Sequence, residues 1–184
     1  VHMQKEVLII IPAYNEEQNI DKVLDNLTTP EISSVCDILV MNDASSDNTN
    51  WKAKKRHVAV VTHVFNLGYG GALQLGYKYA IRYRYKYVIQ MDADGQHDAC
   101  NVLHIYNTLK TKVNGSYPDI VLGSRYMPGS APYPVPFMKN IAYKMFRFII
   151  RATTGKTIMD PTTGLQGLSW RAMVYYSKFG NFDD

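Results

Sequence analysis

Residues 87–97 read YVIQMDADGQH, and this stretch is the most informative one in the chain. The run from Tyr87 to Met91 is short, apolar and rich in β-branched and aromatic residues, which predicts a buried strand. Asp92 and Asp94 follow directly, so we expect them at the C-terminal end of that strand, where open α/β sheets bind ligands. Two carboxylates one residue apart suit a hard divalent cation, Mg²⁺ or Mn²⁺, that takes its other ligands from water and a substrate diphosphate.

The Asp-x-Asp-Gly sequence is also compatible with an ordinary turn, in which aspartates cap and glycine takes a positive φ. A phosphatase with an Asp-x-Asp nucleophile pair would share aspartates placed after a strand. Such an enzyme needs Thr or Val two residues after the second aspartate, where this chain has Gln96, and usually places the pair after its first strand. Here the pair follows the fourth predicted strand, which argues against the phosphatase.

On both sides of this motif, short apolar runs alternate with segments in which apolar residues recur at helical spacing. The runs predict strands at 7–11, 38–41, 58–62 and 120–122, in addition to 87–91, and helices are predicted at 17–27, 71–83 and 99–110. This alternation predicts an α/β fold with a mostly parallel central sheet and helices on both faces. Asn15 is expected to cap the first helix, with the charges of Glu16 and Glu17 at the positive end of its dipole.

Polar clusters follow the predicted strands at 12–17, 42–47, 92–97 and 123–126. Tyr14 is a candidate to flank a nucleobase, while Glu16 and Asp43 are candidates to accept hydrogen bonds from a base or ribose. Simpler roles stay open for each cluster: Tyr14 as a core residue, Glu16 as a helix-start charge, and residues 45–47 as a helix cap.

A glycine-rich run at 66–72, NLGYGGA, resembles a dinucleotide-binding fingerprint only superficially. The pattern G-x-G-x-x-G, counted from Gly68 and Gly70, would place its third glycine where Leu73 stands. The run is therefore interpreted as a glycine turn that permits close helix packing.

Composition bounds the class of protein. The 184 residues are 46% apolar and 20% charged, as in one ordinary globular domain, 1–184. The net charge of +4 arises mainly at 52–56 and 139–156, which fits phosphate-bearing ligands or an anionic membrane surface and not nucleic acid. With only Cys36 and Cys100, a disulfide framework is excluded and a reducing, cytoplasmic location is expected.

The second half of the chain is less regular. Residues 127–136 hold four prolines and are predicted to form a loop. Residues 137–154 predict a basic amphipathic helix, which either lies in a membrane interface, at its inner face, or packs on the sheet. No run is long enough for a membrane span. Val1 and His2 are interpreted as an added extension before a natural start at Met3, and the end at Asp184 as a truncation that removes a membrane anchor or other segment.

Together, these motifs resemble those of family 2 glycosyltransferases. The segments that carry the resemblance are IPAYNE at 11–16, NDASSD at 42–47, NLGYGGA at 66–72, DADGQH at 92–97 and GSRY at 123–126. In addition, DPTTG at 160–164 resembles the D-x-T-S-G segment of the dolichol- and polyprenyl-phosphate sugar synthases within that family. The resemblance covers roughly residues 7 to 170.

The resemblance implies a GT-A fold, a UDP- or GDP-sugar donor and inversion at the anomeric carbon. The site residues carried over with it are Pro12, Tyr14, Glu16 and Asp43 for the nucleoside, Asp92 and Ala93 for the donor, Asp92, Asp94 and Gln96 for the metal, and Arg125 for the diphosphate. Electrostatic stabilisation of the leaving diphosphate, by the metal that Asp94 holds and by Arg125, is expected to be the largest catalytic contribution. His97 is interpreted as a supporting residue.

The acceptor is implied less directly, as polyprenyl phosphate or a glycan intermediate of the cell envelope. Leu165 and Gln166 replace the phenylalanine and arginine that the polyprenyl synthases tend to have, and Asn42 replaces the first of the usual paired aspartates. A lipid phosphate is already anionic and needs little base, whereas a sugar hydroxyl needs a carboxylate. Asp160 is the candidate near the acceptor, followed by Asp183 and Asp184. A nucleotide-sugar-binding or membrane-associated module without turnover remains the alternative.

Overall fold

The computed structural model describes residues 5–95, 100–124, 137–155, 160 and 163–178. Within these ranges a six-stranded sheet has the order β3-β2-β1-β4-β6-β5. The strands are β1 (Val7–Ala13), β2 (Cys36–Asn42), β3 (Ala59–Thr62), β4 (Tyr87–Gln90), β5 (Ile120–Leu122) and β6 (Gln166–Ser169). β1 pairs in parallel with β2 and β4, and β2 with β3, while β6 runs antiparallel to both β4 and β5. The predicted mostly parallel sheet is confirmed.

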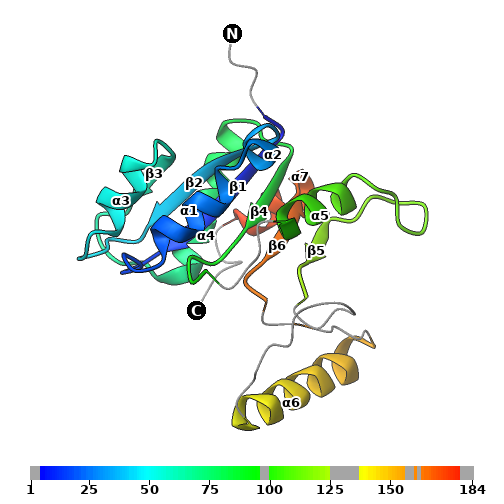
Figure 1. Ribbon diagram of the computed structural model, residues 1–184. Helices are drawn as coiled ribbons and strands as arrows, with labels where there is room; N and C mark the ends of the chain where they lie inside the picture. The colour runs from blue at the N-terminus through cyan, green and yellow to red at the C-terminus, as the bar shows by residue number, and fades with distance from the viewer. Residues whose placement is uncertain (1–4, 96–99, 125–136, 156–159, 161–162, 179–184) are drawn as a thin grey trace.

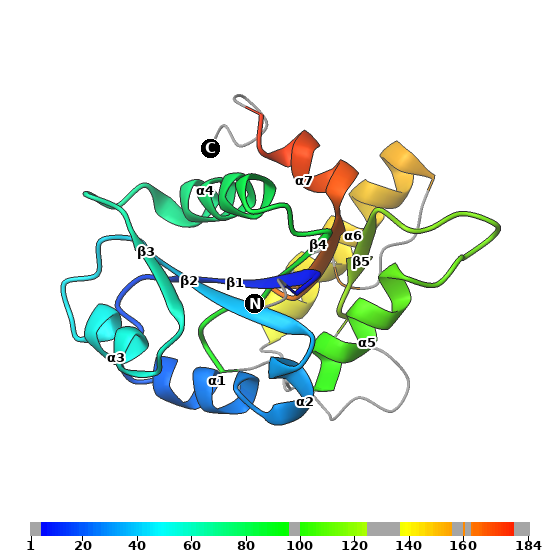
Figure 2. The ribbon, with the colours of Figure 1, turned by 90° about the horizontal axis from the view of Figure 1, so that it is seen from above.

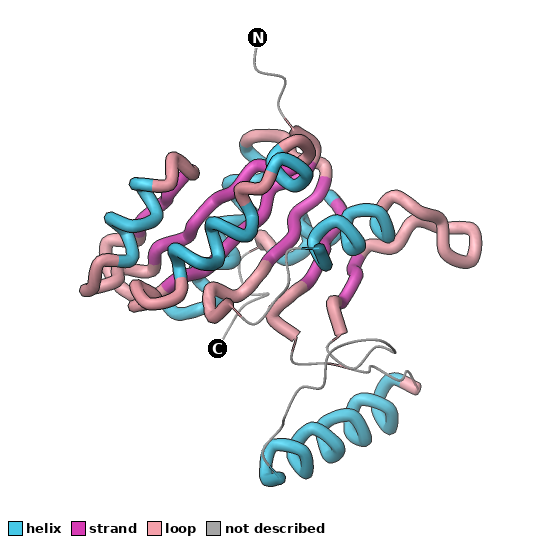
Figure 3. Tube along the Cα trace, viewed as in Figure 1, coloured by secondary structure: helices cyan, strands magenta, loops and turns pink. Residues whose placement is uncertain are grey.

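Helices cover both faces of this sheet, as Figures 2 and 3 show. Their bounds are α1 (Ile20–Leu27), α2 (Pro30–Ser33), α3 (Thr49–Lys55), α4 (Gly68–Arg82), α5 (Cys100–Leu109), α6 (Phe137–Thr154) and α7 (Trp170–Tyr176). Figure 2 shows α4 and α7 on one face and α1, α2, α3 and α5 on the other. α6 lies apart from the sheet (Figure 1). No helix in the described part of the chain is long and apolar enough to cross a bilayer.

β1 explains why a continuous apolar run forms the centre of the sheet. All of its residues are buried, because successive side chains point to opposite faces and both faces are covered. Ile9 and Ile11 belong to the core cluster beneath α1 and α5, whereas Leu8 and Ile10 belong to the cluster beneath α4 and α7. Each such side chain contributes about 1.5 to 3 kcal/mol through burial.

The start of the first helix was predicted wrongly. α1 begins at Ile20 with Asn19 in the N-cap position, and Asn15 lies in a turn at φ +55°. The Asn15 side chain accepts hydrogen bonds from the backbone and hydroxyl of Ser46, so it fastens the loop after β1 to the loop after β2. Residues 15–19 thus belong to the edge of the sheet where ligands are expected, and not to the helix.

Candidate active site

A cleft of about 420 Å³ lies where β1, β2 and β4 end. Its lining residues are Pro12, Ala13, Tyr14, Glu16, Asp43, Asn66, Gly68, Tyr69, Ala72, Asp92, Ala93 and Asp94. The structure therefore brings together the predicted nucleoside, donor and metal residues that lie within the described ranges. They meet because the parallel strands place their C-terminal ends along one edge.

Asp43 is held tightly by the protein itself. It is only 3% exposed. Its carboxylate accepts hydrogen bonds from His63 Nδ1 at 2.6 Å, from the Leu67 amide at 2.9 Å and from the Gly68 amide at 2.8 Å. A carboxylate has about four lone-pair directions, so these bonds leave about one for a ligand. Asp43 thus fixes the segment that begins α4 as well as lining the cleft.

Asn42 shows why an amide can replace the first aspartate of the pair. The residue is 2% exposed. Its Nδ2 donates to Thr62 Oγ1 at 3.3 Å, and its Oδ1 accepts from the Ser45 amide at 3.3 Å. A carboxylate could not donate to Thr62. The amide therefore links the ends of β2 and β3 and leaves the ligand-facing role to Asp43.

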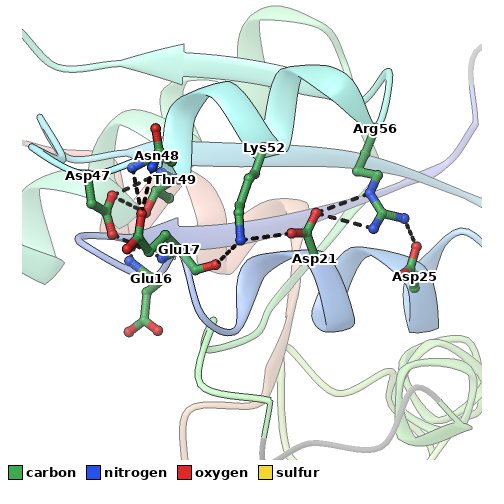
Figure 4. Close-up of polar contacts among 9 residues, drawn as sticks. All are labelled: Glu16, Glu17, Asp21, Asp25, Asp47, Asn48, Thr49, Lys52 and Arg56. Carbon is green, nitrogen blue, oxygen red and sulfur yellow. Dashed lines mark hydrogen bonds and ion pairs between the residues drawn. The ribbon is translucent and has the colours of Figure 1, made fainter.

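The rim of the cleft at Tyr14 and Glu16 rests on a network between the β1 and β2 loops (Figure 4). Thr49 Oγ1 accepts from the Glu16 amide at 2.8 Å, and Asp47 accepts from the Glu17 amide at 3.0 Å. Asp47 also accepts hydrogen bonds from the amide and hydroxyl of Thr49, the first residue of α3. Asp47 thus binds the start of α3, although Asn48 is the N-cap residue. Burial alone would raise the pKa of Asp47, but these hydrogen bonds hold it below its ordinary value.

Two residues of the basic segment 52–56 form ion pairs with acidic residues of α1. Lys52 pairs with Asp21 at 3.1 Å and donates to the Glu17 carbonyl, while Arg56 pairs with both Asp21 and Asp25 (Figure 4). The charges of Lys52 and Arg56 are thus balanced by acidic side chains of the protein itself. These pairs join α1 to α3.

Asp92 is held between two other elements. The Tyr69 hydroxyl, in the first turn of α4, donates to Asp92 Oδ1 at 2.8 Å. Burial and then the negative charge of Asp92 raise the pKa of Tyr69, so its hydroxyl stays protonated and donates. Asp92 also contacts Gly164, where an added Cβ would sit 1.6 Å from Asp92 Oδ2. Only a residue without a side chain fits at that position while Asp92 keeps this orientation.

Gly164 is itself anchored by the end of β5. The Thr163 hydroxyl donates to the Gly123 carbonyl at 2.5 Å, and the Gly123 amide donates to the Leu165 carbonyl at 2.8 Å. Thr163 and Leu165 are both buried. The DPTTG segment thus reaches the first aspartate of the Asp-x-Asp motif through its glycine. Asp160, the candidate near the acceptor, is 2% exposed and is not among the residues that line the cleft.

The donor set that lines the cleft fits a hard divalent cation. Asp92 and Asp94 both line the cleft. Among the described residues, no group of three or more His, Cys, Asp or Glu side chains could enclose a metal ion. Two carboxylates suit Mg²⁺ or Mn²⁺, which keeps few protein ligands and completes its shell with water and phosphate oxygens. Gln96, His97, Arg125, Asp183 and Asp184 lie outside the described residues.

Part of the cleft comes from residues that the sequence did not single out as ligands. Asn66, Gly68, Tyr69 and Ala72 line it, although their glycine-rich run was interpreted only as a packing turn. The available signal was position: the run follows the third strand, whose end lies on the same sheet edge. His63, which orients Asp43, had no distinguishing motif.

Comparison with known proteins identifies the family. The sequence model described as Glycosyl transferase family 2 matches residues 8–173. An uncharacterized protein of Methanocaldococcus jannaschii is 35% identical over 91% of this chain and 66% of its own length. The UDP-N-acetylglucosamine–dolichyl-phosphate N-acetylglucosaminyltransferase of Methanococcus voltae is 28% identical, over 95% and 73%. The undecaprenyl-phosphate mannosyltransferase of Micrococcus luteus is 30% identical, over 86% and 64%.

A solved structure supports the same fold. Glucosyl-3-phosphoglycerate synthase from Mycobacterium tuberculosis, in complex with Mn²⁺, UDP and phosphoglyceric acid, superposes with a TM-score of 0.70 at 20% identity. The match covers 91% of this chain and 56% of the synthase chain. This chain spans about two thirds of the length of the curated relatives named above. The expected GT-A fold is confirmed. The chain belongs to glycosyltransferase family 2.

Proposed function

We propose that this chain is the catalytic domain of a metal-dependent, inverting glycosyltransferase. It moves a sugar from a UDP- or GDP-sugar to an acceptor, which is polyprenyl phosphate or a glycan intermediate of the cell envelope. The observation that carries this proposal is the cleft at the ends of β1, β2 and β4, which brings an aromatic ring and carboxylates from three strands together. An aromatic ring can stack on a nucleobase, and carboxylates can bind ribose hydroxyls and a cation on the diphosphate.

The nucleoside end of the donor would lie near Tyr14, Glu16 and Asp43. The Tyr14 ring is 50% exposed at the rim, so it offers a face on which a base can stack. Glu16 accepts a hydrogen bond from the Asn19 side chain through one oxygen and has acceptor capacity left for a ribose hydroxyl or base N–H. Pro12 also lines this part of the cleft.

The diphosphate end would lie near Asp92, Ala93 and Asp94. Asp92, Asp94 and Gln96 would hold a Mg²⁺ or Mn²⁺ ion, which would offset negative charge on the departing diphosphate. Arg125 is proposed to supply a second positive charge there, with hydrogen bonds fitted to phosphate oxygens. The sugar would then be attacked on the face opposite the diphosphate, which gives inversion.

The acceptor is proposed from the relatives and from α6. Relatives in M. voltae and M. luteus are named for transfer to dolichyl and undecaprenyl phosphate. On α6, Met145, Phe146, Phe148 and Ile149 are exposed, and Arg151 is exposed beside them. An apolar surface with adjacent cations suits the interface of an anionic membrane at the cytoplasmic side. An anionic lipid phosphate would attack without a general base, so Asp160 would be needed only with a hydroxyl acceptor.

Donor and acceptor are tested separately. Thermal unfolding with a panel of UDP- and GDP-sugars should show stabilisation by one nucleotide class in the presence of Mn²⁺. Incubation of the full-length protein with membranes and that donor, labelled in the sugar, should place label in a lipid-phosphate fraction. Label in polymer but never in lipid would reject the lipid acceptor. Donor binding with no transfer by the full-length protein would favour a nucleotide-sugar-binding module.

A further inference from the structure

We infer that Tyr69 is a positioning residue that, with Gly164, sets the orientation of Asp92 for cation and diphosphate binding. This inference rests on the proposed function, because it concerns the diphosphate end of the same cleft. It assigns a role to the hydroxyl group of Tyr69 and to the absence of a side chain at Gly164.

Tyr69 contacts Asp92 from a part of the chain that is itself fixed. Its hydroxyl donates to Oδ1 at 2.8 Å, and hydrogen bonds to a charged acceptor are among the stronger ones in proteins. The preceding residue, Gly68, donates its amide to Asp43 at 2.8 Å. Residues 67–69 are therefore held by the carboxylate after β2 and in turn hold the carboxylate after β4.

Gly164 restricts the Asp92 carboxylate as a second neighbour. An alanine Cβ there would lie 1.6 Å from Oδ2 and 2.1 Å from the carboxyl carbon. Both neighbours of Gly164 are tied to Gly123, Thr163 through its side-chain hydroxyl and Leu165 through its backbone carbonyl, so the easiest response to an added methyl group is rotation of the Asp92 side chain. With Tyr69 on Oδ1 and Gly164 against Oδ2, the carboxylate keeps one orientation before any ligand arrives.

Such an arrangement affects cation binding selectively. Partners that hydrogen-bond to a metal ligand pre-orient it, and their loss typically weakens metal affinity about 10-fold to 100-fold. The alternative is that Tyr69 serves only as a wall of the cleft, since its ring is half exposed and lines it. The two roles differ in the hydroxyl: a wall needs the ring, whereas orientation of Asp92 needs the O–H group.

Calorimetric titration of the wild-type chain with UDP and GDP, in Mn²⁺ and in EDTA, gives the metal-dependent gain in affinity. Tyr69→Phe keeps the ring and should lower that gain about tenfold, while affinity in EDTA stays within about twofold of wild type. Mn²⁺ affinity measured by electron paramagnetic resonance should fall in parallel. Tyr83→Phe, on the half-exposed C-cap residue of the same helix, is the matched control and should keep the full gain.

Gly164→Ala gives a second, independent test. It should lower the metal-dependent gain at least as far as Tyr69→Phe, because Asp92 must turn away from the added methyl group. If this variant fails to fold, Tyr69→Phe decides alone. A full gain in Tyr69→Phe would overturn the inference and leave the proposed function standing. No metal-dependent gain in the wild-type chain, for either nucleotide, would instead overturn the proposed function.

Discussion

At the residue scale, Asp47 shows how one carboxylate outside the cleft supports its rim. It accepts hydrogen bonds from the Glu17 amide and from the amide and hydroxyl of Thr49 (Figure 4). These bonds favour the charged form, which is why the pKa lies below the ordinary value of 3.8 in spite of burial. Tyr14 and Glu16 sit immediately before this junction, so their placement depends on it.

The lowered pKa of Asp47 leads to a pH prediction. A carboxyl group whose pKa is depressed by folding adds stability above its unfolded pKa and loses it as the pH falls through the folded pKa. We expect Asp47→Asn to be less stable than wild type at pH 7, with the difference shrinking as the pH falls below about 4. Urea denaturation at a series of pH values checks this. A difference that stays constant down to pH 3 would contradict it.

At this scale, sequence patterns predicted the positions of site residues only where those residues directly follow a strand. The aspartates of the 92–94 motif could be placed because an apolar run precedes them. The role of Gly164 could not, because its contact is with Asp92, a residue 72 positions earlier in the chain (164 minus 92). Asn15 was misplaced since Asn before two glutamates also fits a helix cap, and only the contact with Ser46 decides otherwise.

At the element scale, α5 packs directly on β6 through a glycine. A Cβ added at Gly167 would lie 2.2 Å from Ile105 Cγ2 and 2.9 Å from Leu109 Cδ1. We expect Gly167→Ala to lower the free energy of unfolding by about 1 to 3 kcal/mol, the usual cost of overpacking. Chemical denaturation measures the loss.

A double-mutant cycle separates this contact from a general effect on the strand. Ile105→Ala removes the atom that the new methyl group would meet. The loss caused by Gly167→Ala should therefore be smaller in the Ile105→Ala background than in wild type. Equal losses in both backgrounds would show that the contact with Ile105 does not cause the destabilisation.

Strands were predicted best where both faces of the sheet are covered, because the strand is then a continuous apolar run. β1, β2 and β4 are largely buried apolar runs, and their positions were found to within a few residues. β6 was missed because Gln166–Ser169 has only one large apolar side chain, Leu168, and contains the glycine that α5 needs. α3 was missed since five of its seven residues are polar or basic, and its packing depends on Lys52 and neighbouring acids.

At the scale of the whole molecule, α6 raises the question of membrane contact. The sequence left two roles open for 137–154, an interfacial helix or a helix packed on the sheet. Figure 1 shows α6 away from the sheet, and Phe148 is 71% exposed. A Phe side chain that enters the interface gains about 1.5 to 3 kcal/mol, which corresponds to about tenfold or more in affinity.

We therefore expect Phe148→Glu to weaken binding to vesicles containing anionic lipid by about tenfold or more, measured by co-sedimentation. Tyr175→Glu, which places the same charge on an exposed position of α7, is the matched control and should bind like wild type. Equal binding by the wild type and Phe148→Glu would show that α6 does not enter the membrane.

The central claim is that the cleft at the sheet edge binds a nucleoside diphosphate through a cation held by Asp92 and Asp94. The most direct measurement is calorimetric titration of UDP and GDP into the wild type and Asp94→Ala, each with Mn²⁺ and with EDTA. We expect Mn²⁺ to strengthen binding of one nucleotide to the wild type and to have no effect on Asp94→Ala, whose binding in EDTA is retained. An Asp94→Ala variant that keeps the full metal-dependent gain would contradict the account.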